Sequence, residues 1–172
     1  MSCSLLKAKS LHLKATSGQI IVEVLVAVSV LTIGFLGVIT LLSRALSLNR
    51  VVSDNYTATY LAAEGIELAK NIIDGNAATF GWGAGANQGA YEIDVYSTAL
   101  AASAEDRPLL FDPAARLYSY RSGIPTSFMR KVTVTPIEDG TAEIQVNSEV
   151  AWVTRGGGRS RVNVEDHFFN WK

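Results

Sequence analysis

The sequence predicts an α+β fold in which one long N-terminal helix packs on a C-terminal antiparallel β-sheet. Three patterns support this prediction. An almost uncharged apolar run extends from Ile20 to Leu42, helical spacing of apolar residues continues to Ile73, and alternation of apolar and polar residues dominates after Tyr91. The first half of the helix is expected to cross a membrane, and the second half is expected to be amphipathic.

The apolar run is long enough for a retained membrane span. Glu23 is its only ionisable residue, and the stretch from Val24 to Leu42 is uncharged. At ~1.5 Å per residue such a stretch crosses a bilayer core. A cleaved secretory signal has an apolar region of only roughly 7 to 15 residues. We therefore expect a single transmembrane segment at about 20–42.

Charge outside the span predicts its orientation. Lys7, Lys9 and Lys14 precede the span without any acid, and this bias keeps a basic N-terminus in the cytoplasm and sends the residues after Arg44 outward. The net charge of −1 over 172 residues gives no nucleic-acid signal. Cys3 is the only cysteine, so the exported part is expected to fold without a disulfide.

Glu23 raises a question, because it lies inside the apolar stretch. A charge deep in a span costs ~2.5–3.5 kcal/mol, and intramembrane acids usually have a partner. Lys14 and Arg44 are both too far along a helix to provide one. The partner is therefore expected on another molecule.

The segment Gly18-Gln19-Ile20-Ile21-Val22-Glu23-Val24-Leu25-Val26-Ala27, behind a Lys-rich leader, resembles the prepilin motif of type IV pilins and pseudopilins. The resemblance implies that prepilin peptidase removes residues 1–18 by cutting between Gly18 and Gln19, and then N-methylates Gln19. It also implies that Glu23 neutralises the terminal ammonium group of a neighbouring subunit during assembly. Gln19 stands in place of the usual Phe or Met, so methylation and cyclisation of this residue both remain open.

Residues 19–74 are expected to form one helix, which Asp74-Gly75-Asn76 ends through a left-handed turn at Gly75. Gly34 and Gly37 indicate either a flexible helix or close packing against a neighbouring helix. Tyr56 and Tyr60 are expected in the core. The helical stripe predicted to pack on the sheet is Val52, Tyr56, Thr59, Tyr60, Ala63, Ile66, Ala69 and Ile73.

Residues 75–172 are expected to form the extracytoplasmic, pilin-like head. The predicted strands are Tyr91–Tyr96, Leu117–Tyr120, Arg130–Ile137, Ala142–Thr154 and Ser160–Phe168, with hairpin turns at Asp139-Gly140 and Gly156-Gly157-Gly158. The region 98–115 gives no prediction. The residues expected to cover the helix are Val132, Val134, Ile144, Val146, Val150 and Trp152.

The sequence does not predict an enzyme. His12 lies in the leader, and His167 lies in a predicted strand, where a structural role is expected. The acids of the exported part do not follow the D-x-D-x-D-G calcium pattern. We therefore expect no catalytic residue, no metal site and no cofactor.

The resemblance, which is greatest to PilV-type minor pilins, implies a structural subunit of a cell-surface filament. The expected partners are prepilin peptidase, other pilin or pseudopilin subunits contacted through the N-terminal helix, the inner-membrane assembly platform and the cytoplasmic membrane. Within the family, a pseudopilin of type II secretion or DNA uptake has the same features. A different alternative is an unprocessed, single-pass anchored module that binds an extracellular ligand.

Overall fold

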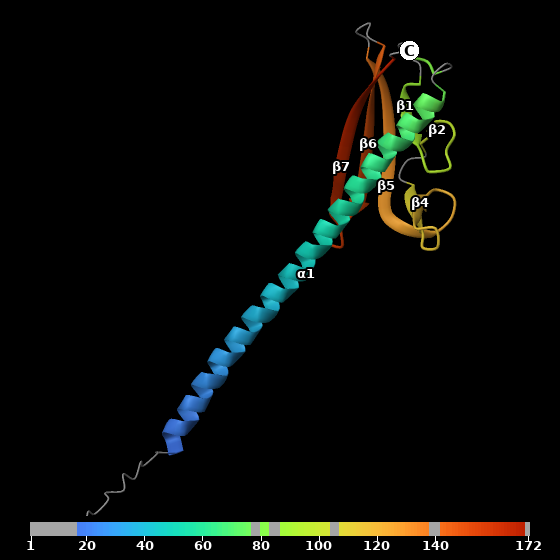
Figure 1. Cartoon of the computed structure of the whole chain (residues 1–172). Helices are drawn as coiled ribbons and strands as arrows, with labels where there is room; N and C mark the ends of the chain where they lie inside the picture. Colours follow the sequence, from blue (N-terminus) through green and yellow to red (C-terminus); the bar gives the residue numbers. More distant parts are fainter. Residues whose placement is uncertain (1–16, 77–79, 83–86, 104–106, 138–141, 171–172) are drawn as a thin grey trace, which may run out of the picture. The chain divides into compact units, whose positions relative to one another are not determined.

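The computed structural model describes residues 17–76, 80–82, 87–103, 107–137 and 142–170. It contains one long helix followed by an antiparallel sheet, which confirms the predicted α+β class (Figure 1). The chain divides into two compact units, the N-terminal unit (Met1–Leu48) and the C-terminal unit (Asn49–Lys172). The elements are α1 (Ser17–Gly75), β1 (Gly89–Glu92), β2 (Ala101–Ala102), β3 (Pro108–Asp112), β4 (Leu117–Ser119), β5 (Ile124–Ile137), β6 (Glu143–Val153) and β7 (Arg159–Phe169).

The helix α1 ends at Gly75, as predicted, but the interactions that cap it differ from the predicted ones. Gly75 is not in the left-handed region, so the expected left-handed turn is wrong. Asn76 ends the helix instead, because its backbone N–H donates to Ile72 O (3.2 Å) and its side-chain amide donates to the same carbonyl (2.8 Å). These bonds satisfy a carbonyl that has no partner further along the helix.

The sheet is built around β5, the longest strand. One edge of β5 pairs with β6, and β6 pairs with β7, which confirms the predicted C-terminal meander. The other edge pairs with β1 at Val132–Val134 and with β3 between Ile124 and Met129. Strand β2 pairs with β1, and strand β4 pairs with β3. Strands β2 and β3 lie in the region 98–115, where no strand was predicted.

The ladder of β5 has a gap at Arg130, between the residues that pair with β1 and those that pair with β3. The buried Tyr120 fills it, because its hydroxyl donates to Arg130 O at 2.7 Å. The Arg130 side chain is fully buried and donates to Leu61 O (3.0 Å) and Glu64 Oε2 (3.0 Å) of α1, and to Ile93 O (2.6 Å). One arginine thus joins the helix, the central strand and the segment after β1.

The inner face of the sheet forms the core with the later turns of α1, which Figure 1 shows lying along the strands. All six residues predicted for this face are at most 2% exposed. On the helix side the buried residues are Ala58, Leu61, Ala62, Gly65, Ile66, Ala69, Ile72 and Ile73.

The expected helix stripe is wrong in its first half. Tyr56 and Tyr60 are 64% and 72% exposed, and they lie on the opposite side of α1 from the buried residues. The helix instead approaches the sheet through small side chains, Ala58, Ala62 and Ala69, together with Gly65. Bulky Val, Ile and Trp side chains from the sheet fill the interface, so two tyrosines do not fit between the layers.

The hairpin between β6 and β7 turns at the predicted glycines. Gly157 has φ +78°, and Thr154 N–H donates to Gly158 O at 2.8 Å to close the turn. A glycine suits this position because side chains disfavour positive φ. The other predicted turn, at Asp139-Gly140, lies outside the described residues.

Candidate functional site

Gly18 and Gln19, the predicted cleavage site, lie in the first turn of α1 and are exposed. A Cβ atom added at Gly18 would meet nothing within 4 Å. Helix ends fray, so only the first turn has to unwind for this peptide bond to become extended. The site is therefore open to a second protein.

Glu23 lies one turn further on α1, among large apolar residues that are themselves exposed. Its neighbours Val22 and Val24 are 60% and 54% exposed. Within the described part of the chain, Glu23 makes no hydrogen bond or ion pair, so none of these residues is the expected partner.

The other polar side chains of the apolar stretch behave differently. The hydroxyls of Ser29, Thr32 and Thr40 donate to carbonyls one turn earlier, at 2.7, 2.7 and 2.8 Å. Such bonds satisfy a hydroxyl without any partner from another helix. Glu23 differs from these residues because it is charged and because it makes no hydrogen bond or ion pair with any described residue.

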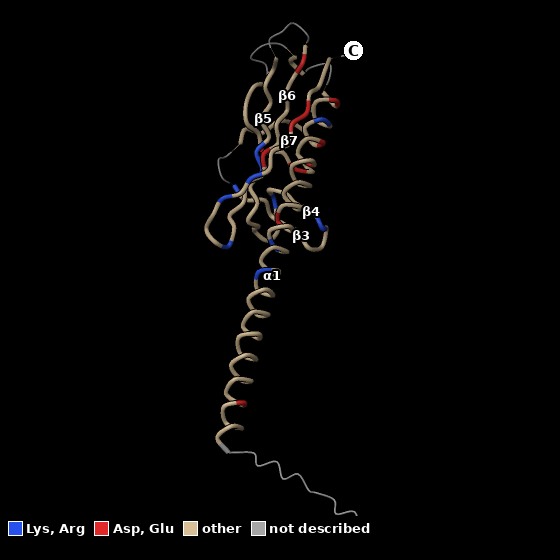
Figure 2. The backbone as a smooth tube through the Cα atoms, turned by 90° about the vertical axis from the view of Figure 1, so that its left-hand side faces the viewer, with Lys and Arg blue, Asp and Glu red and all other residues tan. Residues whose placement is uncertain are grey.

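The early turns of α1 carry few charged residues (Figure 2), and their large apolar side chains are exposed. By length and composition, α1 is suited to cross a membrane. An all-round apolar helix is stable only in lipid or among other helices. The exposed large apolar residues here are Ile20, Ile21, Val22, Val24, Leu25, Val26, Val28, Val30, Leu31, Ile33, Phe35, Leu36, Val38, Ile39, Leu41 and Leu42.

Gly34 and Gly37 lie within this apolar stretch, and the helix continues through both. A Cβ atom at either position would meet nothing within 4 Å. The chain's own packing therefore does not require glycine there. Two explanations were predicted for these glycines, a flexible helix and close packing against a neighbouring helix. Close packing accounts for the glycines without any bend in α1.

Asp94 is a buried carboxylate of the C-terminal unit. Burial by itself raises its pKa, but hydrogen bonds from Tyr120 N–H (3.2 Å), the Ser97 hydroxyl (2.9 Å) and Tyr96 N–H (3.0 Å) outweigh burial and lower the pKa. The carboxylate is ionised, and both of its oxygens accept hydrogen bonds. It therefore stabilises the fold and is a poor candidate for a base.

His167 lies on the outer face of β7 and contacts two carboxylates. Its Nδ1 is 2.5 Å from Glu143 Oε1, and its Nε2 is 3.4 Å from Glu165 Oε1. The hydrogen bonds to Glu143 and then Glu165 raise the pKa of His167. No set of three or more His, Cys, Asp or Glu side chains in the described ranges is placed to hold a metal ion.

Arg130 is a structurally central residue that the sequence analysis did not single out. The sequence pattern could have identified it, because alternate residues of a strand face the same side of the sheet. Arg130 therefore faces the same side as Val132 and Val134, which were predicted to face the core. A buried arginine requires partners on the element packed against it. Glu64 of α1 is that partner.

Comparisons of the chain with protein-family models, curated proteins and solved structures find no match.

Proposed function

We propose that this protein is a structural subunit of a type IV pilus or a related filament, a minor pilin or pseudopilin. In this proposal prepilin peptidase cleaves after Gly18 and N-methylates Gln19. The mature chain then assembles through its N-terminal helix, while residues 75–172 lie outside the cytoplasmic membrane. The proposal rests on the prepilin-like segment around Gly18 and on the geometry of α1.

One observation supports this function above the others. Glu23 is a carboxylate among exposed apolar side chains, it has no partner among the residues that the structure describes, and it is the fifth residue counted from Gln19. Its burial among helices without a cation is costly. A new ammonium group at Gln19 of a neighbouring copy is a cation of suitable charge, and cleavage after Gly18 creates it.

The later turns of α1 offer further support for contacts with other subunits. Val51, Val52, Tyr56 and Tyr60 are between 48% and 72% exposed although they belong to the folded C-terminal unit. Exposed apolar patches of this kind mark interaction surfaces. We propose that helices of neighbouring subunits cover them.

The first test is the intact mass and N-terminal sequence of the membrane-extracted protein, from cells with and without prepilin peptidase. We expect a terminus at methylated Gln19 only when the peptidase is present. A mass corresponding to loss of ammonia instead would identify a cyclised terminus. A chain that still begins at Met1 in both strains contradicts the proposal and favours the unprocessed anchored module.

A pair of variants separates cleavage from assembly. Gly18→Leu is expected to trap the longer precursor, because a large side chain hinders entry to the peptidase. Glu23→Ala is expected to be cleaved normally but to be absent from sheared filaments, with Glu23→Asp as the charge-preserving control. Normal incorporation of Glu23→Ala would remove the proposed pairing role and leave the processing step intact.

A pilus, a secretion filament and a DNA-uptake filament are the candidate assemblies. The chemistry of α1 is the same in each. Co-purification of the crosslinked protein with subunits of one filament type distinguishes them.

A further inference from the structure

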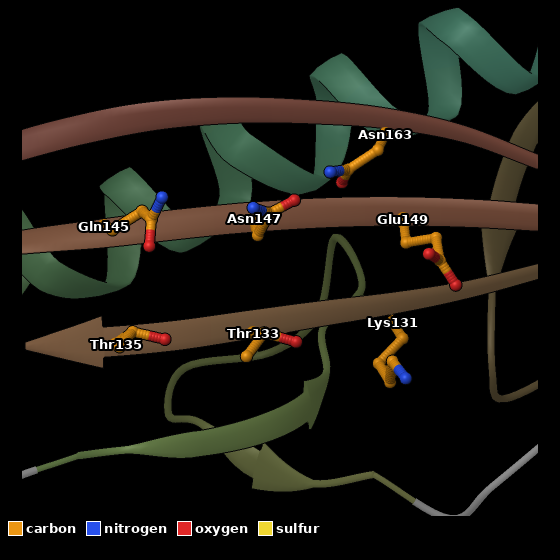
Figure 3. A pocket seen from close by; sticks show the side chains of 7 residues that line it. All are labelled: Lys131, Thr133, Thr135, Gln145, Asn147, Glu149 and Asn163. Atoms are coloured by element: carbon orange, nitrogen blue, oxygen red, sulfur yellow. The ribbon is translucent and has the colours of Figure 1, made fainter.

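A shallow recess lies on the outer face of the sheet, the face turned away from α1 (Figure 3). Its volume is about 290 Å³. Three neighbouring strands contribute, and the residues are paired across them, with Thr133 opposite Asn147 and Thr135 opposite Gln145. The lining residues are Lys131, Thr133, Thr135, Gln145, Asn147, Glu149 and Asn163.

Every lining side chain carries a hydrogen-bonding group, and several of these groups are unused. Within the described ranges, the side chains of Lys131, Thr133, Thr135 and Asn163 make no hydrogen bond or ion pair. Thr133 and Thr135 are half-buried. The recess therefore presents donors and acceptors that only solvent or a ligand satisfies.

Hydrogen bonds to Glu165 of β7 hold the side-chain amides of Gln145 and Asn147 on β6. Asn147 Nδ2 donates to Glu165 Oε2 at 2.8 Å, and Gln145 also hydrogen-bonds to Glu165. His167 contacts the same carboxylate from β7. Because the Asn147 N–H is engaged, its carbonyl oxygen is the free acceptor, next to the hydroxyl of Thr133 across the strands.

Charge and polarity restrict the class of ligand. Lys131 and Glu149 lie opposite each other on β5 and β6, so the lining carries no net charge and does not favour a strongly ionic ligand. No aromatic or aliphatic side chain lines the recess, so an apolar ligand is not favoured either. A ligand hydroxyl group can both donate and accept a hydrogen bond. A ligand rich in hydroxyl groups therefore matches the neighbouring free donors and acceptors of the recess.

We propose that this recess binds a short, uncharged saccharide. Amide and threonine side chains would hydrogen-bond successive sugar hydroxyls, with Lys131 as a donor and Glu149 as an acceptor at one end. The volume is near the lower limit for small-molecule sites, which suits a weak, shallow contact. This inference does not depend on filament assembly.

The test is an amide NMR titration of the full chain in micelles of a detergent without a sugar headgroup. The probes are cellobiose and N,N′-diacetylchitobiose, with glycerol as the non-cyclic polyol control. We expect saturable shifts, for at least one disaccharide, confined to residues 131–135, 145–149 and 163. The expected Kd is on the order of 1 mM.

Two variants test the lining directly. Asn147→Ala and Asn163→Ala are each expected to weaken binding about 3- to 10-fold, because each removes one hydrogen-bonding group. Asn170→Ala, the same change at an exposed residue outside the recess, is the matched control and is expected to leave the Kd unchanged. Dispersed spectra establish that each variant is folded.

Three results overturn the proposal. They are the absence of saturable shifts with both disaccharides, equal shifts with glycerol, and unchanged affinity in both lining variants. Binding of an uncharged Ser- and Thr-rich peptide at the same residues, without binding of either disaccharide, would assign the recess to a protein partner and also overturn it.

Discussion

Gly65 leaves no room for a side chain between α1 and the sheet, and replacing it by alanine is a sharp test of this interface. A Cβ atom at Gly65 would lie 2.3 Å from Ser148 Oγ, 3.1 Å from Arg130 Cδ and 3.3 Å from Ser148 Cβ. The first contact is far too short, so the Ser148 hydroxyl or the helix has to move. Both residues are buried, which leaves little free space for such a movement.

The expected size of the effect follows from two opposing contributions. Overpacking a buried site costs about 1–3 kcal/mol. Alanine in place of glycine within a helix returns about 1 kcal/mol. We therefore expect Gly65→Ala to lower the free energy of unfolding by up to about 2 kcal/mol.

Ser148→Ala provides the matched partner. The Ser148 hydroxyl has no hydrogen-bond partner among the described residues, so its removal is expected to be neutral or slightly stabilising. It also removes the 2.3 Å contact. In the Ser148→Ala background, Gly65→Ala should then become neutral or stabilising, and the coupling energy is the overpacking cost that has been removed, about 1–3 kcal/mol.

The measurement is urea unfolding of the full chain in detergent micelles, followed by tryptophan fluorescence. Trp152, 2% exposed, reports on the core of the C-terminal unit. The midpoint is expected to shift while the slope stays constant. An equal loss of stability for Gly65→Ala with and without Ser148→Ala would refute the steric argument.

Three further predictions concern buried polar groups and the apolar helix. Tyr120→Phe should cost about 1–3 kcal/mol, because it leaves Arg130 O unpaired. Burial raises the pKa of Tyr120 to about 12, so its contribution to stability is complete below pH ~10, the ordinary value, and on the order of 3 kcal/mol is lost as the pH rises through about 12. The stability gap between wild type and variant should narrow in that window, and a constant gap in urea unfolding would contradict this. The hydrogen bonds that lower the pKa of Asp94 despite its burial stabilise the fold above the ordinary pKa and are lost as the pH falls through the folded-state pKa. Asp94→Asn should therefore be less stable than wild type at neutral pH, and the difference in unfolding midpoints should shrink in acid; a difference that persists there would argue against it. Gly37→Leu should keep or raise helix content by circular dichroism, because no described residue crowds that position, but should lower incorporation into sheared filaments. Unchanged incorporation would argue against close packing at Gly37.

Local patterns predicted most of the secondary structure because its causes are local. Alternation predicted which side chains of β5 and β6 face the core, from Val132 to Trp152, since the side-chain period of a strand is fixed by the backbone. The glycine run predicted the turn after β6, because its backbone conformation favours glycine. The short strands β2 and β3 carry no such pattern, and pairing with longer strands creates them.

The helix face was harder to predict. Residue size and hydrophobicity favoured Tyr56 and Tyr60 for the core, yet the helix packs through Ala58, Ala62 and Gly65. Which side of a helix is buried depends on the volume that the opposing sheet leaves free. That volume is set by residues more than 60 positions away, such as Val146 and Val150, so the sequence of the helix alone does not contain the answer.

For this protein the sequence by itself determined an apolar N-terminal helix with one acid, a C-terminal meander and the inner face of that meander, because periodicity and hydrophobicity act within single elements. Only the tertiary structure decided that Arg130 joins three elements, that the tyrosines of α1 stay exposed, and that polar side chains of three strands form a recess. Each of these depends on contacts between residues far apart in the chain, and such contacts arise only when the sheet and helix are packed together.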